Sequence, residues 1–279
     1  MNYRHGFHAG NFADLAKHAV LLAWLRALRE GAPFLVIDSH AGAGLYDLSD
    51  ESFSRSKEAE AGIKALLGAE VPAGLKPLAD YVRAKNAKAG FLDRVGLYPG
   101  SPLLVLDHLR TGDAYLGCEL RDDDYDLLKA RVVPRGRATQ DDGYKVAVDA
   151  AADEKDLFFL IDPPFERPDD YARIVETLSS VLQKRPDARA LVWLPLKDLE
   201  TLDAFLRRLE RYRLDLSPQP AIAVAELRLR SLWNPMKMNG CALVAVNAPD
   251  QVVTQMQTLA TDVVAVFGEA DGLARTYHL

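Results

Sequence analysis

The sequence predicts an α/β fold in which a large, mostly parallel β-sheet carries helices on both faces. Two observations lead to this class. Short apolar runs alternate along the chain with segments whose apolar residues recur at helical spacing, which is the pattern of strands joined by crossover helices. The chain has 279 residues, 49% of them hydrophobic, so it can fill the core of one large domain.

Seven apolar runs are expected to form the strands of this doubly wound sheet. The last two are joined by the polar link RSLWNPMKMNG, which is too short for a crossover helix, so we expect them to pair antiparallel. The predicted strands cover residues 34–39, 114–120, 138–141, 156–162, 189–194, 222–229 and 240–247.

Helices are expected between the strands. The first is bounded by Asn11, a good N-cap residue, and by Gly31, which favours a helix end. The interval between the first two strands is longer than one crossover helix needs, and its two helical patterns predict a small inserted helical subdomain. The predicted helices cover residues 11–30, 61–69, 74–88, 102–109, 122–131, 170–184 and 198–211. The predicted division is 1–47 (N-terminal segment, first helix and first strand), 48–97 (insertion) and 98–279 (remainder of the domain).

The composition restricts the class of protein further. A net charge of −6 argues against a protein that coats nucleic acid by bulk electrostatics, although it leaves room for a local basic face. No apolar stretch approaches the roughly 18 to 20 residues of a membrane span, and the apolar run 19–25 lacks the cleavage site of an export signal. Cys118 and Cys241 have no neighbouring Cys or His at ligand spacing, so we expect buried free thiols. These features favour a cytoplasmic protein without a membrane partner.

A glycine-rich turn, HAGAG, directly follows the first predicted strand. Gly42 and Gly44 would let a nucleotide approach the backbone at the carboxyl edge of the sheet, and His40 stands directly before them. A tight turn without a ligand explains the glycines equally well. Asp47 occupies the third-glycine position of the dinucleotide fingerprint, which argues against a nicotinamide or flavin enzyme.

Acidic residues follow the next two predicted strands. Glu119 stands where nucleotide-binding sheets place a carboxylate for ribose hydroxyls, although acidic residues are common at strand ends. Asp142 and Gly143 could hold an adenine edge, or they could form an ordinary Asp-Gly turn.

The stretch LFFLIDPPFE carries the sharpest chemical signal. Asp162 follows a buried strand, and the two prolines, which have no N–H to donate, stop the strand ladder there. The Pro163 carbonyl is therefore left free beside the Asp162 carboxylate, and Phe165 offers a flat apolar face beyond Pro164. Two acceptors beside a stacking surface suit the exocyclic amino group of a planar base. The alternative is that these prolines only terminate a strand.

Several motifs together resemble one family. HAGAG followed by DPPF resembles the donor loop and catalytic motif of adenine N6-methyltransferases, whose usual motif is Asp-Pro-Pro-Tyr. With YRHGFHAGNFADLAKH, YPGSP, CEL and DDG in the same order, the chain is similar from end to end to the bacterial large-subunit ribosomal RNA methyltransferase J family. The resemblance implies a Rossmann-like, seven-stranded class I methyltransferase sheet with a helical insertion, and N6-methylation of one adenine of 23S ribosomal RNA by S-adenosylmethionine.

The resemblance also implies roles for single residues. Asp162 matches the catalytic residue, Tyr3 matches a tyrosine that meets the RNA, and Phe165 departs from the usual tyrosine, so stacking is kept but a phenolic hydroxyl is lost. On its own, Ser101 before a proline would be explained as an N-cap, and His18 on an apolar helix face as a packed residue. The positions that match donor-binding residues, with Lys17 from the same N-terminal patch, are Lys17, His18, His40, Ser101, Glu119, Asp142 and Gly143.

The N-terminal segment NYRHGFH combines aromatic and basic side chains ahead of the first helix. Tyr3, Arg4 and His5 are expected to contact RNA, because such segments stack bases and meet phosphates; a flexible tail is the alternative. Two clusters of basic residues could extend an RNA surface or could be solvated faces, and their members are Arg207, Arg208, Arg211 and Arg213, and Arg228, Arg230 and Lys237.

We therefore expect a monomeric, metal-independent methyltransferase that acts on protein-free or early-assembling 23S ribosomal RNA. A DNA adenine methyltransferase would use the same quartet, but it would usually need a separate target-recognition region. A nicotinamide-dependent oxidoreductase on a similar sheet and a non-catalytic RNA-binding module are also compatible with the fold class. Methylation of duplex DNA would favour the DNA enzyme, and binding of NAD would favour the oxidoreductase. Replacement of Asp162 without any change in RNA modification would favour the binding module.

Overall fold

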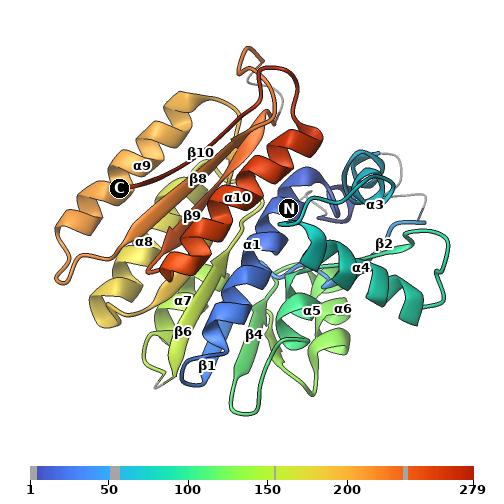
Figure 1. Cartoon of the computed structure of the whole chain (residues 1–279). Helices are drawn as coiled ribbons and strands as arrows, with labels where there is room; N and C mark the ends of the chain where they lie inside the picture. The colour runs from blue at the N-terminus through green and yellow to red at the C-terminus, as the bar shows by residue number, and fades with distance from the viewer. Residues whose placement is uncertain (1–4, 51–56, 154, 235–237) are drawn as a thin grey trace.

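A computed structural model describes residues 5–50, 57–153, 155–234 and 238–279 (Figure 1). An eight-stranded sheet runs through its centre in the order β10-β8-β9-β7-β6-β1-β4-β5. The five strands from β7 to β5 are parallel, and β9, β8 and β10 continue the sheet antiparallel. The strands are β1 (Phe34–Asp38), β4 (Ala114–Cys118), β5 (Arg137–Thr139), β6 (Asp156–Ile161), β7 (Arg189–Leu196), β8 (Ile222–Arg228), β9 (Gly240–Val246) and β10 (Leu273–His278).

The predicted α/β class is confirmed, and all seven predicted strands are present. The predicted count of seven is one too low, because β10 pairs with β8 along its whole length at the edge of the sheet. Its sequence LARTYH is polar, and none of its residues is fully buried, so it lacks the apolar run by which the other strands were found. The antiparallel pairing of β8 with β9 is confirmed.

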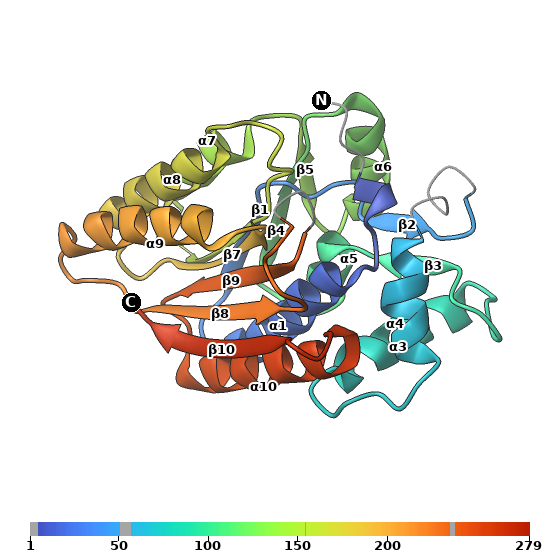
Figure 2. The same ribbon diagram turned by 90° about the horizontal axis from the view of Figure 1, so that it is seen from above.

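Helices cover both faces of the sheet (Figure 2). One face is covered by α1, α5, α6 and α10, and the other by α7, α8 and α9, with a separate apolar core on each side. The sequence predicted all of these except α7 and α10. The bounds are α1 (Phe12–Leu28), α5 (Ser101–Leu106), α6 (Asp122–Val132), α7 (Gly143–Ala150), α8 (Asp170–Lys184), α9 (Leu199–Leu214) and α10 (Asp250–Phe267).

The helix α1 is buried almost all round, because it lies between the sheet and its neighbours α5 and α10. Asn11 caps it by accepting a hydrogen bond from the Asp14 N–H at 2.9 Å. Trp24 packs on Phe158 of β6 with ring centroids 4.8 Å apart. Since α1 is fixed on several sides, the polar residues near its N-terminus are held in one position relative to the strand ends.

The segment between β1 and β4 contains the predicted helical patterns. The short strands β2 (Leu45–Asp47) and β3 (Leu97–Pro99) pair antiparallel, so the two ends of this segment lie side by side. Between them are a π-helical turn η2 (Glu60–Lys64), α3 (Ala65–Leu67) and α4 (Lys76–Lys88). Ile63 and Leu78 belong to the same apolar core as α1. The division of the chain at residues 47 and 97 remains a prediction.

Candidate active site

The carboxyl ends of the parallel strands meet around one cavity of about 910 Å³. It lies where β1 is flanked by β4 on one side and β6 on the other, the position at which such sheets bind ligands. The predicted residues that line it are Lys17, His18, His40, Gly42, Ser101, Glu119, Asp142, Gly143, Asp162 and Pro164.

Behind this cavity a buried hydrogen-bonded cluster holds the end of β1. Asp38 accepts hydrogen bonds from the Ser101 hydroxyl at 2.7 Å and from the Tyr115 hydroxyl at 3.1 Å. Burial raises the pKa of Asp38 to about 6, although both hydroxyls favour the ionised form. The explanation of Ser101 as an N-cap is wrong: Gly100 is the N-cap of α5, and the Ser101 side chain turns to Asp38 instead.

The glycine-rich loop and Glu119 are joined directly. Glu119 accepts a hydrogen bond from the Gly42 N–H at 3.1 Å and another from the Arg121 N–H at 2.8 Å. A carboxylate has about four acceptor positions, so Glu119 can still accept hydrogen bonds from a ligand. Gly42 and Gly44 both have positive φ, but Gly44 does not line the cavity; its carbonyl accepts from the Gly100 N–H. Gly44 therefore shapes the turn rather than the cavity wall.

Asp142 is the N-cap of α7 and Gly143 its first residue, so the motif starts a helix rather than an ordinary turn, and its contact with an adenine edge stays a prediction. Asp142 caps the helix by accepting from the Tyr144 N–H at 3.0 Å, and it pairs with the Arg173 guanidinium. Burial opposes ionisation of Asp142, but Arg173 and the cap outweigh it and lower the pKa. A Cβ at Gly143 would lie 1.9 Å from the Ser39 carbonyl oxygen, so only glycine fits where α7 meets the β1 loop.

The two histidines of the cavity differ in setting. His40 bonds through Nδ1 to the Ser39 hydroxyl at 2.8 Å and meets the Tyr144 ring edge-on. Burial lowers the pKa of His40 to about 3, so this ring is neutral at pH 7. His18 is fully buried, bonds to the Tyr98 hydroxyl at 2.8 Å and stacks on that ring. His18 is thus both a packed residue and part of the cavity wall.

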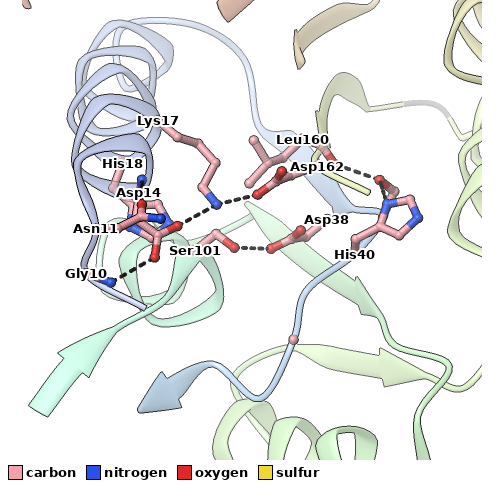
Figure 3. A network of polar contacts seen from close by, with 12 residues as sticks. Gly10, Asn11, Asp14, Lys17, His18, Asp38, His40, Ser101, Leu160 and Asp162 are labelled. Carbon is pink, nitrogen blue, oxygen red and sulfur yellow. Dashed lines mark hydrogen bonds and ion pairs between the residues drawn. The ribbon is translucent and has the colours of Figure 1, made fainter. Parts of the chain in front are cut away.

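A chain of polar contacts runs from the start of α1 to the end of β6 (Figure 3). The Gly10 N–H donates to Asp14 at 3.0 Å, and the Lys17 ammonium donates to Asp14 at 2.9 Å and also to Asp162. Burial alone would lower the pKa of Lys17, but the two carboxylates outweigh it and raise the pKa above its ordinary value. Lys17 is therefore a fully ionised, buried cation between two acids.

A second cavity of about 950 Å³ lies on the other side of Asp162 and Lys17, which line both. Pro163, Pro164 and Phe165 form one wall. The Phe165 ring lies 4.9 Å from the Tyr171 centroid and 5.8 Å from that of Trp193, and its backbone has a φ of 52°. A phenylalanine with positive φ costs conformational energy, and such strain recurs at functional sites.

The carbonyl of Pro163 has the freedom that the sequence predicted. Among the described residues no N–H or O–H donates to it, while Asp162 beside it holds Lys17. The remaining wall of the second cavity comes from the N-terminal region, the segment between β1 and β4, the strand β7 with the residue that follows it, and the loop before β9. Its residues are His8, Asn11, Ala13, Asp14, Glu58, Trp193, Pro195, Lys197 and Met238.

The predicted RNA contacts come from the N-terminal segment and from two basic clusters. Tyr3 and Arg4 lie outside the described residues, and His5 begins the short 3₁₀ helix η1 (His5–Phe7), without a described side chain. Most members of the two basic clusters pair with acids: Arg207 with Asp203, Arg208 with Glu176, Arg213 with Glu210, Arg228 with Glu226 and Arg230 with Glu269, whereas Lys237 lies outside the described residues.

The sequence analysis missed several residues of the site, among them Asp14, Arg173 and Trp193. Asp14 stands three positions before Lys17 on a helix that is otherwise apolar, and this spacing could have signalled a buried ion pair. Arg173 reaches the site from α8, and Trp193 from the middle of β7, and nothing near either in sequence indicates this position.

The described part of the chain holds neither a cluster of metal ligands nor a membrane-spanning helix. No group of three or more His, Cys, Asp or Glu side chains in it could hold a metal ion. None of its helices is long and apolar enough to cross a membrane. Cys118 and Cys241 are both buried free thiols, as predicted.

The fold and the site define a class of protein, the S-adenosylmethionine-dependent methyltransferases. The first cavity fits that cofactor: Glu119 keeps acceptor capacity for hydroxyls, and Asp142 and Gly143 line the same cavity. A family model described as "Ribosomal RNA large subunit methyltransferase D, RlmJ" matches residues 31–278. The chain belongs to this family.

Relatives with assigned names agree with this membership. The chain is 29% identical to "Ribosomal RNA large subunit methyltransferase J" of Escherichia coli over 266 residues, covering 93% of this chain and 91% of the relative. A relative of the same name from Haemophilus influenzae is also 29% identical, with the same coverage. The crystal structure of protein LPL1258 from Legionella pneumophila has the same fold, with a TM-score of 0.84 at 23% identity over 97% of this chain and 98% of that one.

Proposed function

We propose that this enzyme methylates the N6-amino group of one adenine in 23S ribosomal RNA. One observation carries the proposal: Asp162 stands between two cavities, one with the features of a nucleotide site and the other with an aromatic wall beside a free carbonyl. The names of the relatives support ribosomal RNA as the substrate class.

The first cavity would hold the methyl donor. Glu119 would accept hydrogen bonds from the ribose hydroxyls, and Asp142 and Gly143 would meet the adenine edge. Because the His40 ring is neutral, it can face an uncharged part of the ligand without leaving a charge buried away from water. When bound, S-adenosylmethionine supplies an activated methyl group, and no metal is needed for that purpose.

The second cavity would receive the target adenine after it leaves its stack. The base would lie against Phe165, while its amino group donates one hydrogen bond to the Asp162 carboxylate and one to the Pro163 carbonyl. These two acceptors draw the nitrogen lone pair out of the ring and orient it toward the first cavity. The amino nitrogen would take the methyl group as the bond from that group to the donor sulfur breaks, and the bonding pair would stay on the sulfur, which becomes neutral. The Asp162 carboxylate could then accept the extra proton from the nitrogen.

Lys17 would act on this chemistry through Asp162. Its ammonium holds one carboxylate oxygen and leaves the other for the amine, so it fixes the direction in which the acid faces. Asp14 balances the charge of Lys17 from the other side, so the three groups together carry one net negative charge. The Asp162 carboxylate is therefore held in position to accept a hydrogen bond in a partly buried site.

The N-terminal segment would take part in binding the RNA. Tyr3, Arg4 and His5 would meet the nucleotides around the target. His8 and Asn11, which follow them in the sequence, lie in the wall of the second cavity. We further propose a monomer that acts in the cytoplasm, without a metal, on protein-free or early-assembling RNA. Size-exclusion chromatography with light scattering would test the monomer.

The decisive experiment supplies methyl-labelled S-adenosylmethionine and protein-free 23S ribosomal RNA that lacks its native modification. We expect label to appear as N6-methyladenine with the wild type and to fall by more than about a thousandfold with Asp162→Ala, because one acceptor and the orientation it provides are lost. There are two matched controls. Asp162→Asn keeps the shape of the side chain, and Asp141→Asn changes the acid that precedes Asp142 in the sequence and lies outside both cavities.

The outcomes are distinct. Label in RNA that survives Asp162→Ala would contradict the assigned residue, and label in duplex DNA rather than RNA would contradict the substrate. A protein that binds the donor but labels no RNA would contradict the proposed function and leave the class of enzyme intact.

A further inference from the structure

We propose that Trp233, on the loop between β8 and β9, stacks on a nucleobase that flanks the target adenine. The inference rests on the proposed function and extends its RNA site beyond the second cavity. It assigns a role to a residue that lines neither cavity.

The exposure of Trp233 sets it apart. Its relative exposure is 91%, the highest among the large apolar side chains of the described residues, whereas Trp24 is fully buried and Trp193 partly buried in the cavity wall. Leu232, its neighbour, packs against the core, so the loop is anchored at one residue and presents an indole to solvent at the next. A large aromatic ring held outward in this way is typical of a contact surface.

A buried asparagine ties this loop to the rim of the second cavity. Asn239 is 1% exposed, and its side-chain amide donates to the Lys197 carbonyl at 3.0 Å and to the Asn234 carbonyl at 2.9 Å. Both carbonyls lie near one nitrogen, so they are at most about 6 Å apart. Lys197 lines the cavity, and Asn234 directly follows Trp233, so the backbone that carries the exposed indole lies near this rim of the cavity.

The chemistry of this rim suits single-stranded RNA. The side chain of Lys197 is exposed, so it can meet a phosphate, while Met238 adds an apolar contact from the same loop. A cation beside an exposed ring is the usual platform for unpaired nucleotides, because every base offers a face for stacking. When the target adenine is turned into the cavity, its neighbours lose a stacking partner, and the indole can replace it.

Steady-state methylation of an RNA oligonucleotide by the intact enzyme tests the inference. We expect Trp233→Ala to raise KM for the RNA roughly 5- to 150-fold, the range of one base–aromatic stack. The limiting rate and the affinity for S-adenosylmethionine should stay unchanged. Trp233→Phe should recover most of the loss, and Leu92→Ala, at a 79% exposed position outside both cavities, should leave KM unchanged.

Abasic substitution in the RNA identifies the partner. Single abasic sites are introduced at the two nucleotides on each side of the target, and KM is measured with the wild type and with Trp233→Ala. One abasic position should weaken the wild type as much as Trp233→Ala does and should have little further effect in the variant, because the two changes remove the same contact.

Three results would overturn the inference. An unchanged KM for Trp233→Ala, or abasic penalties that are equal in wild type and variant, would remove Trp233 from the RNA site while the proposed function stands. A wild type that binds the donor but methylates no RNA would overturn the proposed function and this inference with it.

Discussion

At the scale of single residues, the contact between Lys17 and Asp162 links the fold to the proposed chemistry. Lys17 is buried in α1, and its ammonium is matched by one carboxylate from its own helix and one from the end of β6. A buried ion is tolerated only when it is paired and hydrogen-bonded. The same contacts that stabilise the helix against the sheet therefore also orient the proposed catalytic carboxylate.

We expect Lys17→Met to lower the free energy of unfolding by about 3–5 kcal/mol, because it leaves the buried Asp14 and the partly buried Asp162 without their cation. Urea unfolding followed by circular dichroism measures this loss. Lys76→Met, which breaks the exposed Lys76–Asp80 pair, should cost no more than about 1 kcal/mol.

A double-mutant cycle separates this pair from general damage to the fold. In Lys17→Met/Asp162→Asn the second change removes one of the two charges left unpaired, so the double variant should be more stable than the sum of the two single losses implies. Additive losses would show that Lys17 and Asp162 are not coupled as described.

At the scale of elements, the start of α7 decides the shape of the first cavity. The helix begins at Gly143 because Asp142 caps it, and the backbone of Gly143 lies against the loop after β1. A strand end, a helix start and a loop therefore meet with no space for a side chain. Such a junction places Asp142 and Arg173 at the cavity, although they come from different elements.

Gly143→Ala is expected to weaken binding of S-adenosylmethionine at least tenfold and to lower the melting temperature, because its Cβ would lie 1.9 Å from a backbone oxygen that cannot move alone. Calorimetric titration and thermal unfolding measure the two effects. Gly31→Ala is the matched control, since its Cβ would be 3.6 Å from the nearest atom; stability should change by less than about 1 kcal/mol. Normal donor affinity in Gly143→Ala would place the donor elsewhere.

At the scale of the whole molecule, the charge limits how the protein can hold RNA. The net charge is −6, and many arginines on the described surface pair with acids, as at Arg208 and Arg213. The net negative charge therefore gives weak overall attraction for phosphates, and much of the affinity should come from stacking and from the pocket for the base.

The affinity for RNA should fall with salt, but gently. With two to four phosphate contacts, the slope of log K against log salt concentration should be roughly −1.4 to −2.8 for a single-stranded substrate. Fluorescence anisotropy of a labelled oligonucleotide between low and physiological salt measures it. The control is the binding of S-adenosylmethionine over the same range of salt concentration, because this binding does not release counterions from an RNA backbone. A slope near zero would argue against phosphate contacts.

The sequence by itself determined the class of the fold and the residues at the strand ends. Apolar runs define buried strands because their faces are covered on both sides, and each such run ends where Gly42, Glu119, Asp142 or Asp162 emerges. The parallel order then brings these ends to one edge. Local patterns were sufficient for this part of the site, since each motif lies directly beside its own strand.

Only the tertiary structure decided which distant groups meet those residues. The edge strand β10 has no continuous apolar run, so its pairing with β8 is decided by hydrogen bonds across the sheet. Lys17 reaches Asp162 across 145 positions, and Asn239, just before β9, donates to the carbonyl of Lys197, just after β7. Such contacts leave no periodic signal in the sequence, because they depend on how α1 and the loops pack against the sheet.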